Sequence, residues 1–251
     1  METTYTILIV DDEPVVRAAA QRILSAHGFT TGTAPDAETA LALLPASAPD
    51  VLVIDLMLPG LSGFALLEQV KTHTPQTAGI VMTGYATVDH AVRALREGAF
   101  DFLPKPFTYD ELLSPVYRAC RYLAQQSAGF SPLPPETFLL GLQAWAKPEP
   151  DGSALLGLTD IFARTAGRII QATLPETGAP MQQGGTLARL QADDDLTHDA
   201  LSALSGQVLA VNPAWQMNPE QAAADPWETG WLVRIRPVDL AEELRRLAGP
   251  S

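Results

Sequence analysis

Short apolar runs alternate with amphipathic stretches along the first half of the chain. The apolar runs predict strands over residues 7–10, 51–54, 80–82 and 100–103, and a Thr- and Gly-rich stretch predicts a weaker strand over 30–34. Between them, apolar residues at helical spacing predict helices over 15–26, 37–44, 64–71, 88–96 and 109–125. Strands that are apolar on both faces need helices on both faces. The pattern therefore predicts an α/β doubly wound, five-stranded parallel sheet of flavodoxin-like type over residues 1–126.

The pattern changes after residue 126. Residues 127–135 read Ser-Ala-Gly-Phe-Ser-Pro-Leu-Pro-Pro, and their glycine and three prolines oppose a helix and favour a semi-rigid linker. Beyond it, short strand candidates over 186–190, 206–212 and 230–236 are separated by Gly, Pro and Asn, with helices expected over 158–166 and 238–247. These signals predict a mostly β domain over residues 136–251.

Both halves of the chain are acidic. The 251 residues include 29 acidic and 16 basic side chains, which gives a formal net charge of −13. Residues 1–128 contain 14 acidic and 8 basic side chains, and residues 129–251 contain 15 and 8. An acidic surface repels phosphate backbones, so the composition argues against a nucleic-acid partner.

The sequence shows no export or membrane signal. The N-terminus carries Glu2 and runs directly into an apolar strand, unlike a basic signal peptide. No apolar run approaches the ~20 residues that a membrane-spanning helix needs. The single cysteine, Cys120, has no partner for an intramolecular disulfide, and we expect it to pack inside a helix. A soluble cytoplasmic protein is expected.

Polar side chains gather where the predicted strands end. Asp11 and Asp12 follow the first strand, Asp55 ends the third, Thr83 follows the fourth and Lys105 follows the fifth. If the strand order is 2-1-3-4-5, strands 1 and 3 are neighbours, so the three carboxylates meet at one edge of the sheet. Crowded carboxylates repel one another unless a cation lies between them, and Mg²⁺ prefers oxygen ligands. The sequence therefore predicts a magnesium site suited to phosphoryl transfer.

At these positions the chain resembles the response-regulator receiver domain of two-component signalling. The resemblance covers about residues 5–124 and is carried by four motifs: Ile9-Val-Asp-Asp-Glu-Pro14, Val53-Ile-Asp-Leu-Met-Leu-Pro-Gly60, Met82-Thr-Gly84 and Phe102-Leu-Pro-Lys-Pro-Phe107. It implies that Asp55 accepts the phosphoryl group. It further implies that Asp12 and Asp55 ligate Mg²⁺ through side chains, Met57 through its carbonyl, and Asp11 largely through water.

The same resemblance assigns roles to three more residues. Lys105 is implied to pair with the phosphoryl oxygens, and Thr83 to turn its hydroxyl onto them after phosphorylation. Phe102 matches the aromatic position that swings inward in the active state. The implied partner is a sensor histidine kinase or phosphotransfer protein, with a homodimer through the fourth and fifth units as a further expectation. Such a domain catalyses only its own phosphorylation and dephosphorylation, so we expect no other enzymatic activity.

The second half resembles the H protein of the glycine cleavage system, a β-rich lipoyl carrier. The matching runs span about residues 136–247: Leu156-Gly-Leu-Thr-Asp160, Leu174-Pro-Glu-Thr-Gly178, Leu204-Ser-Gly-Gln-Val208, Val211-Asn212, Asn218-Pro-Glu220 and Asp225-Pro-Trp-Glu-Thr-Gly-Trp-Leu232. A carrier of that family needs a lysine at a hairpin tip, where this chain has Asp194 or Asp195. No lysine follows Lys147, so we expect no lipoate. The run Asp193–Asp195 is either a solvated acidic loop or a recognition feature for a basic partner.

These features bear on four possible functions. The leading interpretation is a response regulator whose H-protein-like output domain acts on an unknown target by protein contact. A lipoyl-type metabolic carrier is opposed by the missing lysine, and a DNA-binding regulator by the acidic balance and the absence of a basic two-helix motif. An enzyme in the second half would need a base such as His198 beside Asp199. With Ser202 and Ser205, that histidine is interpreted as a surface polar cluster.

Overall fold

The structure is a computed structural model that describes residues 4–45, 48–84, 88–126 and 129–249. Within these residues the chain divides into two compact units. The first holds the described residues of 1–86 and 97–125, and the second those of 87–96 and 126–251. Helix α4 (Val88–Arg96) therefore groups with the second unit. The first two residues of the predicted linker, 127 and 128, lie outside the described residues.

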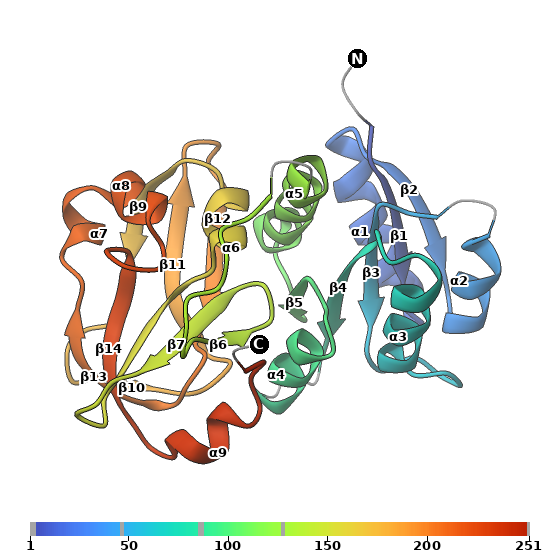
Figure 1. Cartoon of the computed structure of the whole chain (residues 1–251). Helices are drawn as coiled ribbons and strands as arrows, with labels where there is room; N and C mark the ends of the chain where they lie inside the picture. The colour runs from blue at the N-terminus through green and yellow to red at the C-terminus, as the bar shows by residue number, and fades with distance from the viewer. Residues whose placement is uncertain (1–3, 46–47, 85–87, 127–128, 250–251) are drawn as a thin grey trace. The chain divides into compact units, whose positions relative to one another are not determined.

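The first unit is built on a five-stranded parallel sheet (Figure 1). Its strands are β1 (Thr6–Val10), β2 (Thr30–Ala34), β3 (Val51–Asp55), β4 (Ala78–Thr83) and β5 (Asp101–Pro104). Their order is β2-β1-β3-β4-β5, which confirms the predicted order. Every residue of β3 and β4 is buried, as expected for central strands with helices on both faces.

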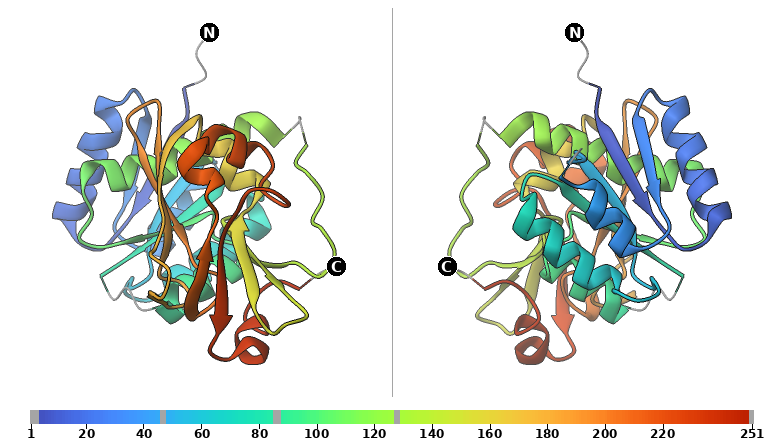
Figure 2. Two further views of the ribbon diagram at one scale, coloured as in Figure 1. Left: turned by 90° about the vertical axis from the view of Figure 1, so that its left-hand side faces the viewer. Right: turned by 90° about the vertical axis from the view of Figure 1, so that its right-hand side faces the viewer.

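Four helices pack on this sheet: α1 (Pro14–Ala26), α2 (Ala37–Leu43), α3 (Gly63–His73) and α5 (Tyr109–Gln125). Helix α1 contacts α5, and α2 contacts α3, so the two pairs lie on opposite faces (Figure 2). The start of α2 is fixed by Asp36, whose carboxylate accepts a hydrogen bond from the Thr39 amide. The predicted doubly wound fold is confirmed, and helix and strand ends differ from the expected ones by at most two residues.

Helix α5 anchors the last strand through a buried ion pair. The guanidinium of Arg118 donates to the carboxylate of Asp101 and lies over the ring of Phe100, 5.4 Å from its centroid. Burial lowers the pKa of Arg118, and Asp101 opposes this shift. Cys120 is buried on the same helix, which confirms its predicted packing role, and burial raises the pKa of its thiol to about 12. Such a thiol stays protonated and unreactive near neutral pH.

The second unit is mostly β, as predicted. A six-stranded sheet has the order β10-β13-β14-β8-β7-β6, and a three-stranded sheet has the order β12-β11-β9. The larger sheet contains β6 (Phe138–Leu140), β7 (Ala144–Pro148), β8 (Ala154–Leu158), β10 (Pro180–Met181), β13 (Gly206–Val211) and β14 (Trp231–Pro237). The smaller contains β9 (Ile169–Thr173), β11 (Thr186–Ala192) and β12 (Thr197–Leu201).

The helices of this unit are short: α6 (Asp160–Thr165), α7 (Ala214–Met217), α8 (Pro219–Ala224) and α9 (Leu240–Leu244). The helix predicted over 158–166 starts later because Leu158 ends strand β8 and Thr159 caps α6, its hydroxyl accepting from the Phe162 amide. The helix predicted over 238–247 is likewise shorter. Among the described residues, no helix has the length and apolar character to cross a membrane.

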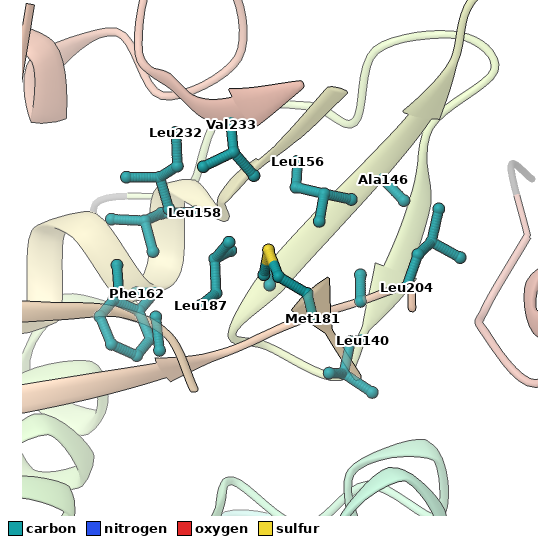
Figure 3. Close-up of a cluster of buried hydrophobic side chains, with 14 of the residues drawn as sticks. Leu140, Ala146, Leu156, Leu158, Phe162, Met181, Leu187, Leu204, Leu232 and Val233 are labelled. Carbon is teal, nitrogen blue, oxygen red and sulfur yellow. The ribbon is translucent and has the colours of Figure 1, made fainter. Parts of the chain in front are cut away.

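Buried side chains from both sheets form the core of the second unit (Figure 3). Figure 3 shows Leu156, Leu158 and Phe162 directed toward Leu187 and Met181. Close packing near this core also restricts which residue can occupy position 157. A Cβ added at Gly157 would lie 2.4 Å from the Trp145 ring. A side chain larger than glycine does not fit there without displacing the tryptophan.

Candidate functional site

Three carboxylates meet at the carboxyl-terminal edge of the first sheet. Asp11 directly follows β1 and Asp55 ends the neighbouring strand β3. One ligand oxygen each from Asp11, Asp12 and Asp55 lies within 4.8 Å of the others. Asp11 and Asp55 are buried, whereas Asp12 is exposed. The strand order thus brings together the carboxylates that the sequence predicted to converge.

Lys105, one residue beyond β5, lies between the two buried carboxylates. Its Nζ is 2.5 Å from Oδ2 of Asp11 and 2.5 Å from Oδ2 of Asp55. A third carboxylate, that of Glu13, lies 3.5 Å from the same nitrogen. The contact with Glu13 was not predicted, although its place directly after the acidic pair is visible in the sequence.

Backbone amides hold both buried carboxylates in the same way. Oδ1 of Asp11 accepts from the Glu13 amide at 2.9 Å, and Oδ1 of Asp55 accepts from the Met57 amide at 2.9 Å. In each case the amide belongs to the residue two positions further on, as in an Asx turn. Both aspartates therefore direct Oδ2 toward Lys105 and toward each other. Oδ1 of Asp55 is thus held by a backbone amide, and its Oδ2 contacts Lys105.

The electrostatics of this cluster favour a further cation. Burial raises the pKa of Asp11, and the hydrogen bond and charge of Lys105 only partly offset that rise. For Lys105, burial lowers the pKa, but its hydrogen bonds to Asp11 and Asp55 outweigh burial and the net shift is upward. Lys105 is therefore a cation at neutral pH, and it leaves part of the cost of the buried Asp11 charge uncompensated. Hard oxygen donors in this number suit Mg²⁺, so the residues present fit that ion.

The remaining predicted residues lie around this cluster. Thr83 ends β4 and is fully buried, one position beyond Met82, which pairs with Asp55 across the sheet. Phe102 is half-buried in β5. Met57 is 53% exposed, and its backbone amide donates to Asp55.

The sequence of the first unit matches a known family model. Residues 7–117 match the response regulator receiver domain. These residues are a receiver domain. The Asp11, Asp12 and Asp55 cluster is the acidic cluster at which receiver domains bind Mg²⁺. The second domain also matches a family model, because residues 140–250 match the glycine cleavage H-protein.

Curated relatives share the receiver. The chain is 40% identical over 120 residues to the DNA-binding transcriptional regulator NtrC of Salmonella typhimurium, covering 48% of this chain and 26% of that protein. It is 44% identical over 119 residues to the regulatory protein AtoC of Escherichia coli, covering 47% and 26%. The crystal structure of the NtrX receiver domain from Brucella abortus is 41% identical, covers 45% of this chain and 96% of that one, and has a TM-score of 0.44. The chain thus spans about a quarter of the length of the curated relatives it matches.

The candidate base in the second domain is not at the surface. His198 and Ser202 are fully buried, so their interpretation as a surface polar cluster was wrong. Strand β12 alternates, and its inward positions are His198 and Ala200. Asp199 faces outward and pairs with Arg189 across the hairpin at 2.8 Å, while the Ser202 hydroxyl donates to the Leu204 carbonyl. The Asp199 carboxylate and the Ser202 hydroxyl are thus engaged in contacts with residues other than His198.

The lysine and the acidic cluster together predict how metal affinity changes. We expect Lys105→Met to strengthen Mg²⁺ binding about tenfold, because ~1.4 kcal/mol of cation–cation repulsion is removed. Asp12→Asn should weaken Mg²⁺ binding.

The pH dependence of Mg²⁺ binding follows from the raised pKa of Asp11. As the pH falls, Asp11 becomes protonated at a higher pH than an ordinary aspartate does, so Mg²⁺ binding by the wild-type protein should weaken at that higher pH. Isothermal titration calorimetry measures these affinities.

The matched control is Lys71→Met, which removes an exposed ammonium that donates to the Glu97 carbonyl. It should leave the affinity unchanged. Unchanged or weaker Mg²⁺ binding by Lys105→Met would contradict the electrostatic account of this site.

Proposed function

We propose that this protein is a two-component response regulator that is phosphorylated on Asp55. Oδ2 of Asp55 attacks the phosphorus of a phosphohistidine on a sensor kinase or phosphotransfer protein. The phosphorus–nitrogen bond breaks, the imidazole leaves, and Asp55 becomes an acyl phosphate. Mg²⁺ held by Asp12, Asp55 and the Met57 carbonyl would neutralise charge on the transferring group. The position of Lys105 between Asp11 and Asp55 supports this proposal most directly.

The same contacts suggest how phosphorylation changes the receiver. Once phosphorylated, Oδ2 of Asp55 no longer bears the charge that pairs with Lys105, and the new dianionic group would attract the lysine and the Thr83 hydroxyl instead. Thr83 ends β4 and Lys105 directly follows β5, so a shift of either residue would move the end of the adjoining strand. Phe102 lies in β5 between them and would change its burial with that movement.

We propose that the second domain acts by protein contact and carries no lipoate. The turn between β11 and β12 contains Asp193, Asp194 and Asp195, where a lipoyl carrier needs its lysine. An amide to lipoic acid requires an amine, and no lysine follows Lys147. The acidic surface of this half also disfavours a DNA target, although NtrC of Salmonella typhimurium is named as a DNA-binding regulator. That match covers only 26% of NtrC, so its output function does not transfer to this chain.

A small phosphodonor tests the receiver proposal. With acetyl phosphate and Mg²⁺, we expect the wild-type protein to take up acid-stable, base-labile phosphate, because Oδ2 of Asp55 is oriented and its product is an acyl phosphate. Asp55→Ala should take up none. Lys105→Ala should still take up phosphate but should lose most of the conformational change that phosphorylation causes. The reason is that the Lys105 ammonium pairs with the phosphoryl oxygens after the transfer. Phosphate uptake by Asp55→Ala equal to wild type would overturn the assignment of Asp55.

Restoring the lysine tests the proposal for the second domain. Wild-type protein incubated with a lipoate–protein ligase, lipoate and ATP should show no mass increase in this domain. Asp195→Lys should gain lipoate, because its ammonium then lies at the exposed tip of the β11–β12 hairpin. Because the carrier position is either Asp194 or Asp195, Asp194→Lys is tested in parallel, and a gain of lipoate by either variant would place the missing amine in this turn. Lipoylation of the wild-type protein would contradict the proposal.

A further inference from the structure

Residues 129–131 of the predicted linker are bound to helix α6. The amide of Ser131 donates to Oδ2 of Asp160 at 2.7 Å. The guanidinium of Arg164 donates to the carbonyl of Gly129 at 2.7 Å and lies over the ring of Phe130, 4.9 Å from its centroid. Three separate interactions, two hydrogen bonds to charged groups and one cation–π contact, therefore hold three consecutive residues.

The two residues of α6 support each other. Asp160 and Arg164 are one helical turn apart, and their charged groups lie 3.6 Å from one another. Asp160 is buried, and Arg164 has only 36% of its side chain exposed. A buried carboxylate needs partners, and the Ser131 amide is one of them.

An apolar cavity of about 90 Å³ lies beneath this segment. Phe130 and Leu133 line it from the linker, while Leu142, Ile161 and Trp227 line it from the β domain. The linker segment thus covers apolar surface of the β domain that would otherwise meet water. Burial of such surface adds to the hydrogen bonds that hold the segment.

We propose that residues 129–133 form a lid on the second domain, closed by an Asp160–Arg164 latch. The lid is the resident occupant of the apolar surface that includes Leu142, Ile161 and Trp227. Helix α5 ends at Gln125, so the lid is the first part of the second domain that the chain reaches after the receiver. Opening the latch would free Phe130 and Leu133 and expose the apolar surface beneath them. This inference stands on the latch contacts alone and is independent of phosphorylation.

Hydrogen exchange of the full-length protein tests the latch. Arg164→Ala removes the donor to Gly129 and the cation over Phe130, so we expect about tenfold faster exchange of the Ser131 amide. Arg168→Ala is the matched control: it removes the same charge near the same helix, but Arg168 pairs with Glu220 at 3.0 Å. Exchange at Ser131 in that control should stay within about twofold of wild type. Equal exchange in Arg164→Ala and in wild type would overturn the proposal.

A second variant keeps the test decisive if Arg164→Ala disturbs the fold. Ser131→Pro removes only the amide that donates to Asp160, and the residue before Pro132 already favours the extended backbone that proline accepts. We expect this variant to bind the apolar dye ANS more strongly than wild type, because the cavity is uncovered. Trp227 lines the cavity and would report its opening, so the fold is checked separately: a far-UV circular dichroism spectrum and a thermal unfolding midpoint equal to those of wild type would show that the domain remains folded. A folded Ser131→Pro variant with wild-type ANS binding would contradict the lid.

Discussion

The ammonium of Lys105 between two buried carboxylates is the interaction on which the first domain depends. Asp11 and Asp55 lie on adjacent central strands, and without a cation between them their charges would repel at short range in a poorly solvated place. The strand order β2-β1-β3-β4-β5 brings them together, and the loop after β5 supplies the lysine. The fold thus brings two negative charges into repulsion, and a cation between them offsets that repulsion. A site of this kind responds to any change in the charge of Asp55.

The sequence predicted this part of the structure well for a physical reason. Parallel strands buried on both faces are continuous apolar runs, so their ends are marked by the first charged residue, and those ends lie on one edge of the sheet. The anchoring of Asp11 and Asp55 by the amides of Glu13 and Met57 was not predicted. It depends on local backbone turns, and nearly any residue type supplies an amide.

The second domain was predicted less completely because its signals are weaker. Strand β7 contains Lys147 and Pro148, which are typical of loops, and the inward residues of β12 are a histidine and an alanine instead of large apolar side chains. The contacts of Arg164 with Gly129 and Phe130 were not predicted, because these residues are far from it in the sequence. Contacts between a short helix and a distant irregular segment produce no periodic pattern of apolar residues from which they could be predicted.

Acidic residues have different roles in the two domains. In the receiver they converge on a lysine and form an acidic cluster of the kind at which receiver domains bind Mg²⁺. In the β domain three of them occupy the turn between β11 and β12. The central claim is that Asp55 is the reactive carboxylate. Borohydride reduction of the phosphorylated protein, followed by peptide mass spectrometry, locates an aspartyl phosphate directly. The account predicts conversion to homoserine at Asp55 alone, and conversion at Asp11 or Asp12, with Asp55 intact, would contradict it.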